Sequence, residues 1–199
     1  AFFEAHGGSY GHYGASAAYG YAKGDSNIGL TLGYDRLQGF SATNENYPYG
    51  DFPDQDGYRN QSASLRAGTK LGTQRLSFSA LATNGDVEFD EGETDAHNRV
   101  YALQLAGPLA AGWNHALVLG RSTEDLDTPA YASKFGSERN TLDWTVSKAL
   151  DEHNDIDLGL NLAREYGYSN ELYTGNFDSD RDNTALFVSW RGRYGAQSW

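Results

Sequence analysis

The sequence contains no cysteine and no methionine, and basic residues are scarce. Without cysteine the chain has no disulfide framework, no thiolate metal site and no cysteine nucleophile. The missing methionine at position 1 indicates that a signal peptide was removed or that the segment comes from a longer polypeptide. The 15 Lys and Arg residues against 27 Asp and Glu give a net charge of −12. This balance argues against a nucleic-acid-binding protein, which neutralises phosphates with basic side chains.

Long apolar runs are also missing. No stretch approaches the roughly 18 residues that a membrane-spanning helix needs, which excludes a helical membrane protein. The 199 residues suffice for one domain, and 24 glycines with 14% aromatic residues are unusual for a helical or α/β fold. The composition therefore predicts an all-β protein.

Apolar residues alternate with small or polar ones about ten times along the chain, which is the period of a β-strand. The clearest segments lie at 27–35 and 156–162, and others at 63–70 and 141–147. In each segment one face carries leucine, alanine, valine or aromatic side chains, and the other carries Gly, Ser, Thr, Asn and isolated charges. Apolar residues that face lipid and small polar residues that face a watery interior are typical of a transmembrane β-barrel. A soluble β-sandwich is the alternative.

The links between these segments alternate in length. Short links are predicted at 23–26, 71–73, 107–112 and 150–154, and long ones at 40–57, 85–98, 122–138 and 168–182. Outer-membrane barrels have tight periplasmic turns and longer extracellular loops. Aromatic residues near the strand ends, such as Tyr19, Tyr101 and Trp190, fit the interfacial girdles of such barrels. We therefore predict an antiparallel transmembrane β-barrel with about ten strands visible, its long loops extracellular.

Three stretches carry a resemblance to a known family: the glycine-rich hairpin at 7–14, the short turn at Gly24, and the DQDG element at 54–57. With the strands around them, they resemble the first half of the barrel of TonB-dependent outer-membrane transporters, and most closely the vitamin B12 (cobalamin) subgroup. The resemblance extends diffusely to about residue 191, and only DQDG is at all specific.

The resemblance implies a barrel of about 22 strands, closed by an N-terminal plug, that imports a large scarce nutrient with energy relayed by TonB. It implies that residues 1–199 are a partial barrel region, with the plug and its TonB contact absent from this chain. The expected partners are outer-membrane lipid and a nutrient such as cobalamin or a siderophore. An even number of strands near ten can also close into a small barrel by itself.

Acidic residues gather in two of the predicted loops. Asp54 and Asp56 lie in the DQDG element, and Asp86 and Asp90 in the next long loop. Calcium takes six to eight oxygen ligands, which neighbouring loops supply jointly. In the cobalamin subgroup the resemblance implies a calcium site here that orders the loops over the substrate, although Ser41 stands where the family has a further carboxylate. Solvated loop acids are the alternative.

Aromatic residues beside these acids, Tyr49, Phe52 and Tyr58, are the candidate substrate contacts. None of the five histidines has metal-ligand spacing, although His6 and His12 flank one hairpin tip and could approach each other. Asp95 and His97 suggest an outer-membrane hydrolase as an alternative function, and a passive pore or adhesin is another. No catalytic motif supports an enzyme, so we expect recognition and gated passage without covalent chemistry.

Overall fold

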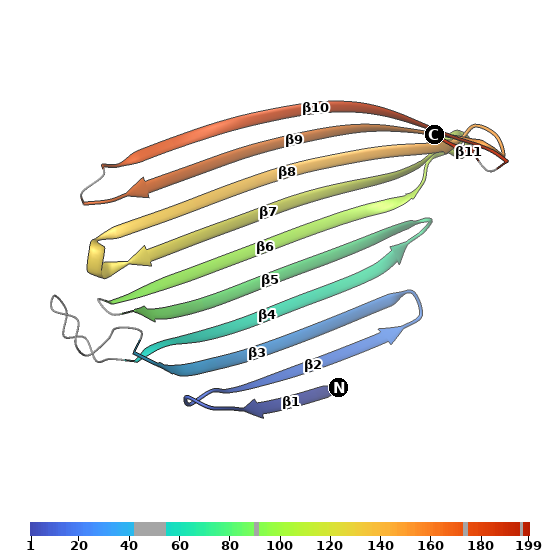
Figure 1. Ribbon diagram of the computed structural model, residues 1–199. Coiled ribbons are helices and arrows are strands. Elements are labelled where there is room, and N and C mark those ends of the chain that lie inside the picture. Colours follow the sequence, from blue (N-terminus) through green and yellow to red (C-terminus); the bar gives the residue numbers. More distant parts are fainter. Residues whose placement is uncertain (42–54, 90–91, 173–174, 196) are drawn as a thin grey trace.

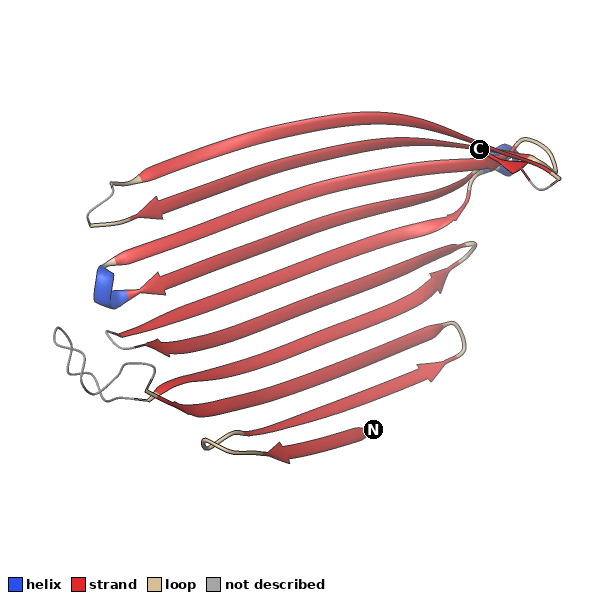
Figure 2. Ribbon diagram, viewed as in Figure 1, coloured by secondary structure: helices blue, strands red, loops and turns tan. Residues whose placement is uncertain are grey.

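The computed structural model describes residues 1–41, 55–89, 92–172, 175–195 and 197–199. These residues form one curved antiparallel sheet whose strands follow one another in chain order (Figure 1). The strands are β1 (Phe2–Gly7), β2 (Tyr13–Lys23), β3 (Ser26–Phe40), β4 (Asp56–Leu71), β5 (Gln74–Phe89), β6 (Gly92–Pro108), β7 (Asn114–Thr128), β8 (Ser133–Ala149), β9 (Asn154–Asn170), β10 (Phe177–Tyr194) and β11 (Gln197–Ser198). Two single 3₁₀ turns, η1 (Ala110–Gly112) and η2 (Pro129–Tyr131), lie in links between strands (Figure 2).

The sheet is a single layer with no second layer packed on either face. Among the described residues, Ala163 is the one apolar residue that is buried, whereas Leu186 is 79% and Val188 71% exposed. A soluble sandwich buries the apolar faces of two sheets against each other. The soluble alternative is therefore wrong.

No helix in the described part of the chain is long and apolar enough to cross a membrane.

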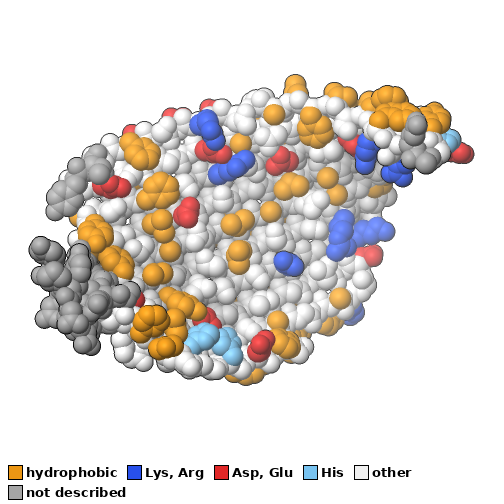
Figure 3. Space-filling view, in the orientation of Figure 1, with side chains coloured by type: hydrophobic (Ala, Val, Ile, Leu, Met, Phe, Trp, Pro, Cys, Tyr) orange, Lys and Arg blue, Asp and Glu red, His pale blue; other side chains and the backbone are white. Residues whose placement is uncertain are grey.

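The strand register sorts the alternating residues onto two faces, as predicted. The outer face carries apolar rows, one of which runs across seven strands: Ile28, Ala67, Phe78, Leu103, Leu119, Leu142 and Leu162. The inner face carries the residues between them, and the adjacent row there reads Gly29, Arg66, Ser79, Ala102, Gly120, Thr141 and Ala163. Figure 3 looks onto the inner face, where small groups of charged side chains lie among polar side chains and backbone.

The short links fall where they were predicted, but three of the four long ones do not. Strands β5 and β6 reach Phe89 and start again at Gly92, where a loop over 85–98 was expected. In the same way, β7 and β8 take up most of 122–138, and β9 and β10 most of 168–182. The sequence hides these strand ends because the outer face carries charged residues there, such as Asp86, Asp95 and Asp127, and backbone pairing needs no apolar outer face. Only the link between β3 and β4, residues 41–55, is long.

The two outermost long strands leave the sheet open. The order runs from β1 to β11 without a return, so β1 is not paired with β10 among the described residues. In Figure 1 the two lie at opposite borders of the sheet. Closure of these ten strands into a small barrel, which the sequence left open, is not what the structure shows.

Candidate functional site

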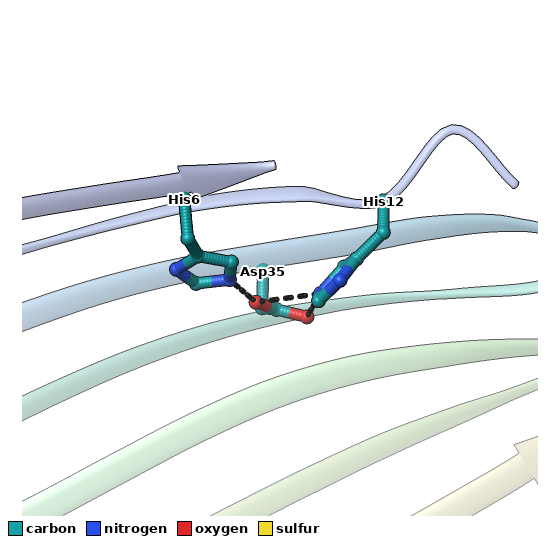
Figure 4. Close-up of side chains that lie close together, drawn as sticks. All are labelled: His6, His12 and Asp35. Carbon is teal, nitrogen blue, oxygen red and sulfur yellow. Dashed lines mark hydrogen bonds and ion pairs between the residues drawn. The ribbon is translucent and has the colours of Figure 1, made fainter. Parts of the chain in front are cut away.

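Three side chains from the first three strands converge on the inner face, close to the tip of the first hairpin. His6 is the penultimate residue of β1, His12 lies just before β2, and Asp35 lies in β3 (Figure 4). The His6 Nε2 atom is 2.8 Å from Asp35 Oδ2, and His12 Nε2 is 3.1 Å from Asp35 Oδ1. The two imidazole rings are 5.0 Å apart between centroids. The two histidines thus approach each other, although separate interfacial or loop histidines were the favoured interpretation of the sequence, and a carboxylate joins them.

The hairpin tip brings His12 back over the sheet. The Gly8 N–H donates to the His12 carbonyl at 2.8 Å, and Tyr10 and Gly11 have φ angles of 57° and 66°. Glycine adopts this left-handed conformation at little cost, whereas tyrosine does so rarely. The sharp turn ends with His12 facing the same carboxylate as His6.

Gly14 provides the space in which the three side chains meet. It pairs with His6 on one side and with Asp35 on the other. A Cβ atom at position 14 would lie 2.5 Å from Asp35 Oδ2 and 2.6 Å from His6 Nε2. Because glycine has no side chain, His6 and Asp35 reach across it and touch.

Tyr58 adds a fourth group from β4. Its hydroxyl donates a hydrogen bond to Asp35 Oδ1 at 2.5 Å. The side chains remain accessible, with 45% of His6, 33% of His12 and 27% of Asp35 exposed. We call His6, His12, Asp35 and Tyr58 the inner-face cluster. It is a polar, solvent-accessible group of two imidazoles, a carboxylate and a phenol.

The structure places only part of the predicted calcium and substrate sites. Asp54, Asp90, Tyr49 and Phe52 lie outside the described residues. Asp56 begins β4 opposite Phe40, and Tyr58 belongs to the inner-face cluster.

Asp86 lies on the outer face of β5 and faces Arg59 across the β4–β5 pair. The Arg59 Nε atom donates to Asp86 Oδ2 at 2.5 Å. Asp86 and Asp56 are thus in different strands, and by the alternation of β4 and β5 they are on different faces. The structure does not bring these two acids together.

The Asp95 and His97 pair is also on the outer face. His97 Nδ1 lies 2.9 Å from Asn84 Oδ1, and Asp95 is in register with Asp86 and Asp127. Neither residue is part of the inner-face cluster, so the pair that suggested a hydrolase does not face the barrel interior.

Charged residues predicted to face inward do so. Arg66 and Asp143 alternate with apolar neighbours that lie on the outer face. Asp157 accepts from Arg191 at 3.0 Å, and Asp143 accepts from Asn161. Glu165 lies between Arg139 and Arg181 and is paired with both. Paired charges of this kind suit a surface that faces water or another polar domain.

No family model matches the sequence, and no curated protein matches it. In fold the chain is similar to the ferric yersiniabactin uptake receptor FyuA from Yersinia pestis, with a TM-score of 0.53 and 11% identity over 91% of this chain. It is similar also to the siderophore receptor PiuA from Acinetobacter baumannii, with a TM-score of 0.57 and 10% identity over 91% of this chain. The chain has the fold of an outer-membrane receptor barrel.

The likeness covers only part of those receptors. This chain spans 34% of FyuA and 39% of PiuA. At this level of identity the match shows the fold alone.

Proposed function

We propose that this chain forms part of the wall of a TonB-dependent outer-membrane transporter that imports a large, scarce nutrient. The observation that carries the proposal is the two-sided sheet: an apolar outer face and a polar inner face on strands arranged as in two siderophore uptake receptors. The proposed location is the outer membrane of a Gram-negative bacterium, with the 41–55 link on the extracellular side. TonB would act through a plug domain.

The substrate class follows from the neighbours and from the resemblance. FyuA is a ferric yersiniabactin uptake receptor and PiuA a siderophore receptor, and the sequence resembles the cobalamin subgroup. Both nutrients are large, polar chelates, and a polar inner face with paired charges provides hydrogen-bonding groups for such molecules. We propose a siderophore first and cobalamin second.

The function is tested by uptake in cells that carry or lack the native gene. ⁵⁵Fe-loaded siderophores and labelled cobalamin are supplied separately, with and without TonB. We expect energy-dependent accumulation of one of them only when both the gene and TonB are present. Accumulation that persists without TonB would instead indicate a passive pore, and cell-surface binding with no accumulation would indicate an adhesin.

We also propose that calcium orders the 40–57 region over the substrate, with Asp54 and Asp56 as the principal ligands. Asp86 and Asp90 are the proposed additional ligands. Asp86 lies on the opposite face of the sheet from Asp56, so it must leave Arg59 and the end of β5 must turn before Asp86 can reach the ion. Calorimetric titration with CaCl₂ should show a site that Asp54→Ala with Asp56→Ala abolishes. Asp25→Ala, in the turn at the opposite end of β3, is the control that should leave it unchanged.

A further inference from the structure

The inner-face cluster presents donor atoms that suit a transition metal. One ligand atom each from His6, His12 and Asp35 lies within 4.8 Å of the other two. Two imidazole nitrogens and a carboxylate oxygen form a donor set of zinc sites, and of the 2-His-1-carboxylate sites that hold iron(II). Calcium prefers oxygen ligands only. The cluster is therefore a different kind of site from the calcium site proposed above.

The spacing requires only small adjustments to admit an ion. Zinc bonds to nitrogen and oxygen of about 2.0–2.2 Å place neighbouring tetrahedral ligands roughly 3.3 Å apart. His6 Nε2 and His12 Nε2 lie 2.8 Å and 3.1 Å from the nearest Asp35 oxygens. A slight outward movement of each side chain makes room for the ion, and all three side chains are partly exposed.

Gly14 is a second, independent feature of this place. The space above its Cα would be filled by a single methyl group, which would contact both His6 and Asp35. The position pairs with both residues across two different strands. The local backbone thus leaves open the volume into which two of the three ligands point.

Tyr58 holds the carboxylate from the far side. Carboxylates and imidazoles that bind metals are oriented by hydrogen bonds from a surrounding group, and loss of such a group weakens binding by about 10- to 100-fold. The Tyr58 hydroxyl donates to Asp35 Oδ1 while Oδ2 faces His6. The phenol thereby orients Oδ1, which His12 Nε2 also approaches at 3.1 Å, while Oδ2 lies 2.8 Å from His6 Nε2 and 3.3 Å from His12 Nε2.

We propose that His6, His12 and Asp35 bind one divalent transition-metal ion, with zinc as the test ion, on the inner face of the sheet. Water completes the coordination from the exposed side. Each imidazole binds the ion as the neutral tautomer with its proton on Nδ1, so that the Nε2 lone pair replaces the hydrogen bond to Asp35. Bound metal joins β1, the hairpin tip and β3, so it stabilises the border of the sheet.

The test is calorimetric titration of ZnCl₂ into the full-length protein in detergent. We expect one zinc ion per chain, with affinity reduced by about 10- to 100-fold in Tyr58→Phe and reduced further in His6→Gln and His12→Gln. His97→Gln is the matched control, because His97 has a similar hydrogen bond to Asn84 on the outer face. Equal affinity in the wild type and in the His6→Gln/His12→Gln double variant would overturn the proposal, as would selective loss in His97→Gln.

Two further measurements keep the test decisive if a histidine variant fails to assemble. Gly14→Ala retains all the ligands but fills the space between them, and it should weaken zinc binding. Anomalous X-ray diffraction at the zinc edge on wild-type crystals should place one peak between His6, His12 and Asp35. Absence of a peak there at saturating zinc would contradict the site whatever the variants do. Neither result depends on nutrient uptake, so this proposal and the proposed function fail separately.

Discussion

Among the described glycines, Gly39 is the one at which an added Cβ atom would come closest to the backbone of a neighbouring strand. It has a φ of +79°, and it lies where the β3–β4 register shifts between Leu37 and Phe40. A Cβ atom there would lie 2.1 Å from the Asp56 carbonyl oxygen, which is backbone and cannot rotate away. The bulge thus combines a left-handed conformation with a close backbone approach, and glycine meets both needs.

Replacement of this glycine should destabilise the barrel more than replacement of a glycine with the same backbone conformation in open space. We expect Gly39→Ala to lower the free energy of unfolding by about 2–3 kcal/mol. Gly24→Ala is the matched control, because Gly24 has a φ of +57° and no atom within 4 Å of its added Cβ. It should cost about 1 kcal/mol. Denaturant unfolding from lipid bilayers measures both, and equal losses would mean that the contact with Asp56 does not matter.

The contacts within the inner-face cluster could not be predicted from the sequence. His6, His12 and Asp35 are too far apart in sequence to show a ligand motif, and only the strand register brings them together. One signal was available: a tight hairpin at 8–12 places His6 opposite Gly14, and the turn at 24–25 then places Asp35 opposite the same glycine. The close contact across Gly14 depends on side-chain rotamers, which alternation does not specify.

In the turn between β8 and β9, the Asp151 carboxylate accepts hydrogen bonds from the two residues that complete the turn. Asp151 Oδ1 accepts from the His153 backbone N–H at 2.8 Å and from the Asn154 side chain at 2.9 Å. These hydrogen bonds, led by that from His153, hold the pKa of the Asp151 carboxyl below its ordinary value. A carboxylate whose pKa is lowered on folding stabilises the fold at pH values above its unfolded pKa, about 3.9.

The contribution of Asp151 should therefore depend on pH in a defined window. We expect Asp151→Ala to be less stable than the wild type near neutral pH, with a difference that shrinks as the pH falls below about 4 and through the lower folded pKa. Glu152→Ala, in the same turn, is the control and should show no such pH dependence. Unfolding followed by tryptophan fluorescence from neutral pH to below pH 4 measures the stability difference between Asp151→Ala and the wild type. A difference that stays constant in acid would contradict the role given to the Asp151 carboxylate.

Membrane-facing strands should tolerate charge on one face only. Leu103 lies on the outer face of β6 in the row between Phe78 and Leu119, and Gln104 follows it on the inner face. Leu103→Arg should lower the free energy of unfolding in a bilayer by about 2–4 kcal/mol, because arginine near the midplane loses its hydration. Gln104→Arg should change it by about 0.5 kcal/mol or less. Similar losses in both variants would show that the face assigned to lipid is wrong.

Alternation predicted these strand faces well because lipid imposes it on every membrane-crossing strand. Ile28 and Leu103 fall on the outer face, and Asn27 and Gln104 on the inner one, as their periodicity indicated. It predicted the strand ends poorly. At Asp86 and Asp95 the strands remain paired, but the outer face is polar, and the ladder is held by backbone hydrogen bonds and by ion pairs such as Arg59 with Asp86. At strand ends that no longer contact lipid, the outer face does not need apolar residues, so the period-2 pattern of hydrophobicity disappears there.

At the scale of the whole molecule, the main question is what completes the sheet. The open borders at β1 and β10 leave backbone donors and acceptors that lipid does not satisfy, and such edges are not stable within a membrane. The receptors with a similar fold are more than twice as long as the part matched here. We therefore expect further strands to lie between β1 and β10 in the assembled barrel.

Cysteine cross-linking tests this arrangement directly, because the chain has no cysteine of its own. Ala5→Cys combined with Ala15→Cys is the positive control, since the two residues are opposite each other in the β1–β2 pair. Cα atoms of opposed residues in an antiparallel pair are about 4.5–5.5 Å apart, which a disulfide spans.

The test variants combine Ala5→Cys in turn with cysteine at one of four outer-face positions of β10: Asp182, Thr184, Leu186 and Val188. In the native protein in outer membranes, we expect the control pair to cross-link and none of the four test pairs to do so, because other strands separate β1 from β10. An efficient intramolecular cross-link from Ala5 to β10 would mean that these ten strands close by themselves, and the lumen would then be too narrow for a plug and a large chelate. That result would replace transport of a large nutrient with a small barrel of a different function, while leaving the strand faces and the inner-face cluster unchanged.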